Sequence, residues 1–108
     1  MASQNVVQTL AQIYVLVGMI YAKADRSVKS SIIDIDGYQA YAEVLVEGLA
    51  KSLRVYVRDG SRRKFDQVIS VGVLDNWATS EIFIPNTWVA NVVLKALQDL
   101  AKKLGITI

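Results

Sequence analysis

Hydrophobic and polar positions in the first quarter of the chain repeat with the period of a helix. Apolar residues recur three and four positions apart, which predicts a helix over residues 4–23 with Ser3 as its N-cap. Residues 13–20 are also rich in β-branched side chains and contain Gly18, so a short helix followed by a strand fits this run almost equally well. Because the segment is apolar on nearly every side, we expect it to lie in the core or beneath a partner subunit.

A hairpin signal follows. Asp36-Gly37 lies between two apolar-rich segments, and this arrangement predicts strands over residues 31–35 and 38–47. A helix over residues 38–52, capped by Asp36, is the competing interpretation. It would carry a polar stripe at every fourth position, formed by Gln39, Glu43, Glu47 and Lys51. We prefer the strands.

From Leu53 onward, apolar residues alternate strictly with basic or aromatic residues, and this pattern predicts a half-buried strand. Leu53, Val55 and Val57 are expected on one side, and Arg54, Tyr56 and Arg58 on the other. Residues 59–61 are expected to turn the chain into a longer strand within residues 64–74. One face of that strand would comprise Phe65, Gln67, Ile69, Val71 and Val73. Residues 75–80 are expected to form a loop, and 81–84 a short strand ending at Pro85.

The C-terminal pattern predicts a helix over residues 87–104. Asn86 is its expected N-cap, Lys102 and Lys103 suit the negative end of the helix dipole, and Gly105 suits the position after the last turn. The expected buried stripe consists of Val89, Val93, Leu97, Leu100 and Leu104. The elements together predict one α+β domain over residues 1–108: an N-terminal helix, an antiparallel meander of four to five strands, and a C-terminal helix. One face of the sheet is then covered and the other is open.

The composition bears on assembly and location. Of the 108 residues, 53% are hydrophobic, which is more apolar surface than a small monomer easily buries, so we expect a homodimer or a higher homo-oligomer. The N-terminus has no basic region typical of a signal peptide, and the apolar run over residues 9–22 is shorter than the roughly 20 residues that cross a bilayer. We therefore expect a cytoplasmic protein without membrane association, and membrane association of the apolar run is the lesser alternative. The absence of cysteine, the single proline and the many Ile and Val residues suit a thermophile.

The absence of both cysteine and histidine argues against the usual metal centres and against a Ser, Cys or Thr nucleophile with its ordinary base. Asp34 and Asp36 lack the further oxygen ligands of a calcium loop, so we assign them to a turn. No cofactor, no metal and no enzymatic activity are expected.

Charge is concentrated in one segment. Residues 51–64 carry six basic side chains against Asp59 alone, a net charge of +5, whereas the remaining chain is −3. A concentrated basic segment is typical of phosphate binding, because neutralising phosphates releases condensed counterions. Tyr56 lies between Arg54 and Arg58 on one expected strand face, and rings flanked by cations are the combination that holds single-stranded nucleic acid.

The expected binding residues are Lys51, Arg54, Tyr56, Arg58, Arg62, Arg63 and Lys64, with Tyr41 and Trp77 extending the stacking surface. A second interpretation is an ordinary exposed strand, because tyrosine favours strands and basic side chains on an edge deter aggregation. Trp77 and Trp88 also fit the core or an interface, and Phe65 and Phe83 fit the core.

From Leu53 onward the order of elements resembles that of the positive-coactivator and Whirly-type single-stranded DNA binders. The segments that carry this resemblance are "LRVYVRDG", "KFDQVISVGVL" and "EIFIPNTWVANVVLKALQDL", about half of the chain. The resemblance implies a curved antiparallel sheet, dimers built through helices, and DNA along the sheet. The long N-terminal helix departs from this family. It fits instead a resemblance to an archaeal ThermoDBP-like single-strand binder, or a fold that shares only the meander.

A rival resemblance depends on residues 38–52. If they are helical, the element order resembles that of Roadblock-type scaffold domains, which dimerise and support protein partners without nucleic-acid binding. The secondary structure of this segment therefore separates the two hypotheses.

Overall fold

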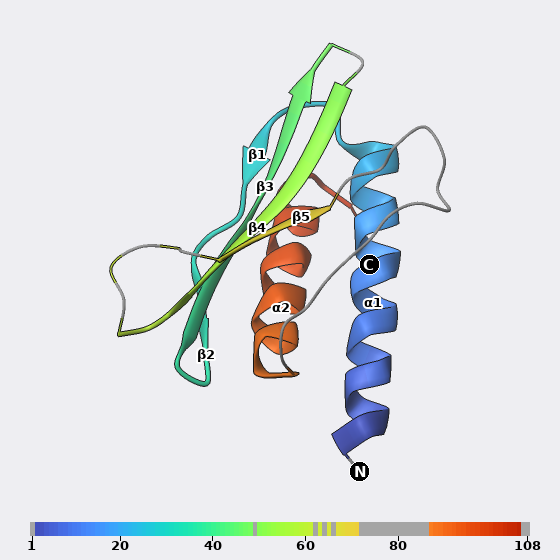
Figure 1. The fold of residues 1–108 in the computed structure, drawn as a ribbon. Helices are drawn as coiled ribbons and strands as arrows, with labels where there is room; N and C mark the ends of the chain where they lie inside the picture. The colour runs from blue at the N-terminus through green and yellow to red at the C-terminus, as the bar shows by residue number, and fades with distance from the viewer. Residues whose placement is uncertain are drawn as a thin grey trace.

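The computed structural model describes residues 2–48, 50–61, 63, 65, 67–71 and 87–106. Its elements are α1 (Ala2–Lys23), β1 (Val28–Lys29), β2 (Ile33–Ile35), β3 (Tyr38–Glu47), β4 (Ala50–Asp59), β5 (Gln67–Val71) and α2 (Thr87–Lys103). The described elements form one antiparallel sheet with both helices on the same side of it (Figure 1). The predicted α+β class and the order of helix, antiparallel strands and helix are confirmed.

The centre of the sheet is the long β3–β4 hairpin. Its ten-residue strands pair along their whole length, from Tyr38 opposite Asp59 to Glu47 opposite Ala50. β5 pairs with the other edge of β4, whereas β1 and β2 both pair with β3, one at each half of that strand. The helix considered for residues 38–52 is therefore wrong.

The turn between β2 and β3 requires its two residues. Asp36 and Gly37 both have positive φ, 54° and 82°, which is the backbone of a type I′ turn. Asparagine, aspartate and glycine reach this region at the lowest cost, and the turn matches the natural twist of the two strands. The hairpin signal in the sequence is thus confirmed.

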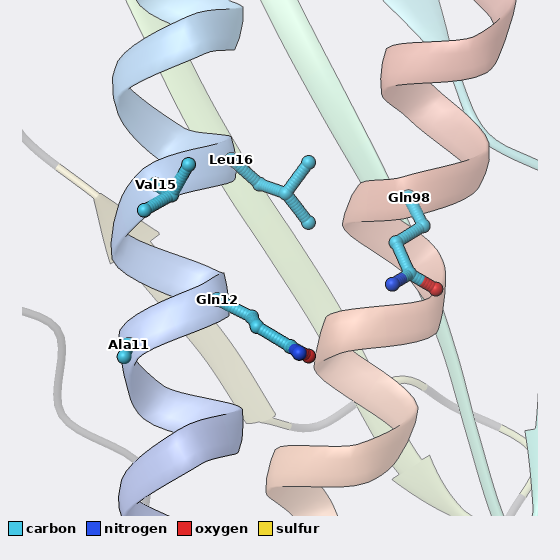
Figure 2. Close-up of a pocket in the computed structure, with 5 residues that line it drawn as sticks. All are labelled: Ala11, Gln12, Val15, Leu16 and Gln98. Carbon is cyan, nitrogen blue, oxygen red and sulfur yellow. The ribbon is translucent and has the colours of Figure 1, made fainter. Parts of the chain in front are cut away.

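The two helices lie side by side on one side of the sheet (Figure 1). α2 packs against β3, whereas α1 packs mainly against α2 and contacts the sheet along β4. A groove of about 290 Å³ follows the seam between the helices and is lined by Ala11, Gln12, Val15, Leu16 and Gln98 (Figure 2). This arrangement leaves the opposite side of the sheet without a helix.

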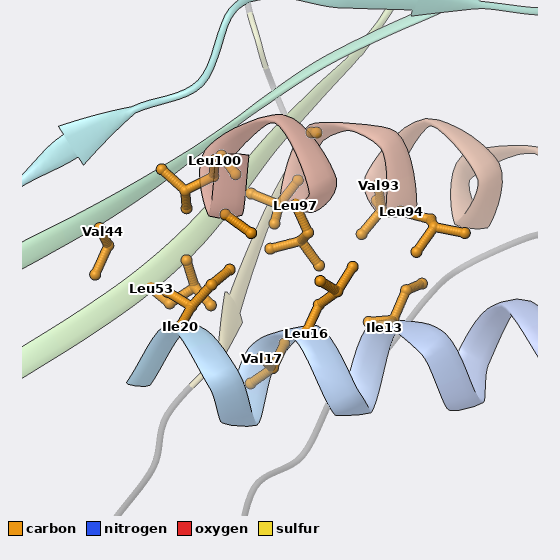
Figure 3. Close-up of a cluster of buried hydrophobic side chains, with 14 of the residues drawn as sticks. Ile13, Leu16, Val17, Ile20, Val44, Leu53, Val93, Leu94, Leu97 and Leu100 are labelled. Carbon is orange, nitrogen blue, oxygen red and sulfur yellow. The ribbon is translucent and has the colours of Figure 1, made fainter. Parts of the chain in front are cut away.

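The core lies between the helices and the covered face of the sheet (Figure 3). From α1 it receives Ile13, Leu16 and Ile20, which are at most 2% exposed, and they face Leu97 of α2 and Leu53 of β4. α1 continues as a helix through these β-branched residues to Lys23, so the helix-then-strand alternative is wrong. The packing of one complete helical face outweighs the small intrinsic cost of β-branched residues in a helix.

The end of α2 follows its capping signal. Gly105 has φ 78°, and its N–H donates to the Lys102 carbonyl at 3.0 Å while the Ile106 N–H donates to the Ala101 carbonyl at 2.9 Å. This pair of bonds closes the helix with a glycine in the left-handed region. The predicted helix over residues 87–104 is confirmed to within one residue, and Val89, Val93, Leu97 and Leu100 of its stripe are buried whereas Leu104 is half-buried.

Several expectations fall on other parts of the chain. The predicted loop over residues 75–80, the strand over 81–84, Trp77, Phe83 and the cap Asn86 lie outside the described residues, as does the side chain of Trp88. Within the described part of the chain, neither helix is sufficiently long and apolar to cross a membrane.

Candidate nucleic-acid interface

The sheet surface turned away from both helices is here termed the outer face. On β4, Leu53, Val55 and Val57 are buried beneath the helices, so Arg54, Tyr56 and Arg58 point to the outer face. The register places Glu43 of β3 opposite Arg54, Tyr41 opposite Tyr56, and Gln39 opposite Arg58. The strand alternation therefore predicts correctly which side of the sheet carries the two arginines and the ring between them.

Three aromatic rings meet on the outer face. Tyr41 and Tyr56 stack with centroids 4.8 Å apart and planes inclined by 16°. Phe65 meets Tyr41 edge to face, with centroids 5.0 Å apart and planes at 85°. Offset-stacked and edge-to-face pairs are the favourable arrangements of aromatic rings. The cluster thus forms an ordered apolar platform between the two arginines.

The assignment of Phe65 to the core is wrong. Phe65 is half-buried, and its ring contacts Tyr41 and the Arg58 guanidinium on the outer face. The prediction placed Phe65 on the same strand face as Gln67, which requires the alternation of side chains to include residue 65. In the structure, β5 begins at Gln67. Because Phe65 itself lies outside the strand, the two-residue period does not decide to which side of the sheet its ring turns.

Arg58 is held in place by three neighbours. Its Nε donates to Gln39 Oε1 at 2.6 Å, one terminal nitrogen donates to the Arg63 carbonyl at 2.9 Å, and its guanidinium carbon lies 4.3 Å from the Phe65 ring centroid. Gln39 Nε2 in turn donates to Asp34 Oδ2 at 3.2 Å. These contacts fix a planar cation beside the rings, and its direct hydrogen-bond acceptors are uncharged.

Arg54, at the other end of the platform, is exposed and differently placed. Its cross-strand neighbour Glu43 is paired with Lys29, with Nζ and Oε2 3.5 Å apart. Lys29 Nζ also lies 5.8 Å from the centroid of the Tyr41 ring. Within the described part of the chain, no hydrogen bond or ion pair engages the Arg54 guanidinium. The Arg54 guanidinium is consequently available to a ligand.

Lys51 is not part of the outer face. Its Nζ donates at 2.8 Å to the carbonyl of Tyr21, in the last turn of α1, on the side of the sheet that carries the helices. In β4 it shares the parity of Leu53, so its side chain leaves the sheet on the covered side. Among the other expected binding residues, Arg63 is exposed beside Arg58, and Arg62, Lys64 and Trp77 lie outside the described residues.

Gln39, Lys29 and Phe65 belong to the outer face, although the sequence did not single them out as binding residues. Gln39 could have been found from the hairpin, because a turn at Asp36-Gly37 and a turn near residue 48 fix its position opposite Arg58. Lys29 lies in a two-residue strand, which is too short to show any periodicity. Among the described residues, no group of three or more acidic side chains could hold a metal ion.

The outer face therefore combines an available guanidinium, a fixed guanidinium and three rings, and it is suited to binding a flexible anion that carries flat groups. Comparison of the chain with protein-family models, with curated proteins and with solved structures finds no match.

Proposed function

We propose that this protein binds single-stranded nucleic acid, DNA or RNA, on the outer face without reading the base sequence. The observation that carries the proposal is the line Arg54, Tyr56 and Arg58 on one strand, with the second face of Tyr56 in contact with no other ring among the described residues. Arg54 supplies charge for a phosphate, and Tyr56 supplies a surface for a base.

The dimensions support a short stretch of extended strand. Four residues of β-strand separate Arg54 from Arg58, which corresponds to about 13 Å. Two cations at that separation can contact the phosphate backbone of one nucleic-acid strand while the ring between them accepts a stacked base. A duplex keeps its base faces stacked internally, so the same surface favours single strands over duplexes.

The outer face also carries acids, and their placement matters. Glu43, with only 14% of its side chain exposed, is paired with Lys29, and Asp34 accepts a hydrogen bond from Gln39. Lys29 thus offsets the carboxylate that lies opposite Arg54. This supports phosphate binding at the Arg54 end.

The alternative of a Roadblock-like scaffold domain has less support, because the element order that suggested it is not the one observed. The Roadblock-type element order required a helix over residues 38–52, and the chain forms β3 and β4 there. A scaffold role stays an untested hypothesis, as do the resemblances to single-stranded DNA binders. We further expect the active form to be a homodimer or higher homo-oligomer. The cytoplasmic location, the thermophilic source and the absence of enzymatic activity stay predictions from the sequence.

The direct test is a fluorescence-anisotropy titration at low salt with labelled oligonucleotides about 16 nucleotides long. Oligo-dT, oligo-rU and a duplex of matched length are compared. We expect binding of both single strands, weaker binding of the duplex, and an affinity that falls with salt by a logarithmic slope of about 0.7 per phosphate contact. If the protein leaves the anisotropy of every single strand unchanged, the proposed function is wrong.

A further inference from the structure

α1 exposes an apolar surface on the side that faces away from the core. Four large hydrophobic side chains are strongly exposed in the described part of the chain, and three of them belong to this helix: Val7 (65%), Tyr14 (49%) and Val15 (60%). No charged side chain occurs before Lys23. An exposed helix of a monomeric protein normally carries charged residues opposite its buried face, so α1 departs from the usual pattern.

Helical geometry gathers these residues into one band. At about 100° per residue they share a sector roughly 100° wide, opposite Ile13, Leu16 and Ile20 of the core. This band is termed the outer stripe of α1, and it consists of Val7, Ala11, Tyr14, Val15, Gly18 and Ala22. Ala11 and Val15 also line the groove along the α1–α2 seam, where the polar groups are the uncharged amides of Gln12 and Gln98 (Figure 2).

The absence of charge restricts what can cover the outer stripe. A partner with charged residues would leave them desolvated and unpaired against it. A membrane surface usually attracts helices with Lys or Arg along their polar face, and α1 has neither before Lys23. A second outer stripe meets both conditions, because it is equally apolar and equally uncharged.

We propose that the outer stripe of α1 pairs with the same stripe of a second copy of this chain, in an antiparallel arrangement with the two-fold axis between Tyr14 and Val15. The distribution of side-chain sizes favours this direction. The bulky members lie in the first two-thirds of the stripe, and the small residues Gly18 and Ala22 lie at its end. Antiparallel pairing sets Val7 against the partner's Ala22, and it flanks the contact of Tyr14 with the partner's Val15 at the two-fold axis by the small residues Ala11 and Gly18. A parallel pair would instead set Val7 against the partner's Val7 and leave a void between the small residues Gly18 and Ala22 at the other end of the stripe.

The assembly has a consequence for the outer faces. The outer stripe belongs to α1, which lies on the covered side of the sheet, and it contains no residue of the outer face. Pairing through α1 therefore leaves both outer faces open. The dimer does not depend on the proposed function, and it is tested without nucleic acid, so either proposal can fail alone.

Sedimentation equilibrium up to about 100 μM protein tests the pairing, a range that detects dissociation constants in the micromolar region. We expect a reversible dimer. Val15→Glu should raise its dissociation constant at least about 100-fold, because each copy brings one buried, unpaired carboxylate. Ile32→Glu is the matched control: Ile32 is 56% exposed but lies outside α1, and its substitution should leave the dimer unchanged. A monomeric wild type, or a Val15→Glu protein that dimerises like wild type, overturns the proposal.

The direction of pairing is tested with introduced cysteines, since the chain has none. A mixture of the Ala11→Cys and Gly18→Cys proteins should form a disulfide between the two variants on mild oxidation, and neither variant alone should cross-link. Cross-linking of Ala11→Cys with itself at the dimer concentration would show parallel pairing and overturn the antiparallel arrangement. The mixed disulfide supports the antiparallel register, and a dimer without any cross-link overturns that register. Far-UV circular dichroism verifies that each variant keeps its helices.

Discussion

Tyr41 of β3 stacks on Tyr56 of β4 directly across the ladder, with ring centroids 4.8 Å apart. A stacked cross-strand pair of this kind contributes about 0.5–1.5 kcal/mol beyond the area that it buries. On the outer face the same pair also forms the centre of the proposed binding platform. The two roles can be separated, because stability and ligand affinity respond differently to the removal of one ring.

Replacement of Tyr56 tests the platform. We expect Tyr56→Ala to weaken oligonucleotide binding by about 1–3 kcal/mol, which is the contribution of one base stacked on one aromatic side chain. The loss of the Tyr41 stack should also lower the free energy of unfolding by at least about 0.5–1.5 kcal/mol. Anisotropy titration and urea unfolding measure the two effects. Tyr56→Phe keeps the ring and should behave like wild type in both assays.

Tyr56→Leu provides the second control, because it keeps an apolar side chain but no ring face. If Tyr56→Leu binds as tightly as Tyr56→Phe, the ring only supports the sheet and the base-stacking role is wrong.

The exposed guanidinium of Arg54 gives a second prediction. Arg54→Glu removes an exposed cation that is available to phosphate and places an anion beside Glu43. We expect the affinity for single strands to fall at least about tenfold at low salt, and the logarithmic salt slope to decrease by about 0.7, the value of one phosphate contact.

Lys95→Glu is the matched control for this charge reversal. Lys95 is exposed on α2, on the other side of the sheet, and its reversal changes the net charge by the same amount. The affinity of this variant should remain near that of wild type. Equal losses for Arg54→Glu and Lys95→Glu would mean that overall charge, and not the outer face, governs the interaction.

The fold could be predicted where a few consecutive residues specify the local structure by themselves. Asp36-Gly37 specifies a turn that few other residue pairs form, and the alternation from Leu53 to Arg58 orients every side chain of that stretch. The choice between strand and helix for residues 38–52 was harder. Their polar residues also fit a helical stripe, and only pairing with β4 makes the strand preferable.

The errors at the candidate site have equally local causes. Its charge and its nearness in sequence suggest Lys51 for the basic surface, but the alternation of strand side chains, extended back from Leu53, places it on the covered side. The usual burial of aromatic side chains predicts Phe65 in the core, but its ring lies on the outer face. Phe65 lies outside the strand and contacts Tyr41, and strand periodicity carries no information about the side-chain direction of a residue outside a strand.

Replacement of Lys51 should lower stability without weakening the binding of single strands. Its ammonium donates to the Tyr21 carbonyl at 2.8 Å, so it satisfies one acceptor at the end of α1 and lies at the negative end of that helix dipole. Lys51→Met keeps most of the apolar stem and removes the donor. We expect the free energy of unfolding to fall by about 0.5–1.5 kcal/mol, while the affinity for single strands changes by less than about threefold. A loss of binding as large as that of Arg54→Glu would show that Lys51 belongs to the binding surface.

The turn at Asp36-Gly37 gives the last prediction. Gly37 has φ 82°, and an alanine there meets no steric obstacle, so the cost of Gly37→Ala arises from the backbone conformation alone. We expect the free energy of unfolding in urea to fall by about 1–2 kcal/mol, the cost of a non-glycine residue in the left-handed region. Gly37→Asn should lose less stability, because asparagine adopts this region more readily.

The Gly37 carbonyl also accepts the Gly60 N–H at 2.7 Å and so joins the β2–β3 turn to the end of β4. Because neither substitution removes that carbonyl or a side chain of the outer face, both variants should bind single strands like wild type. Equal stability of Gly37→Ala and wild type would contradict the positive-φ turn.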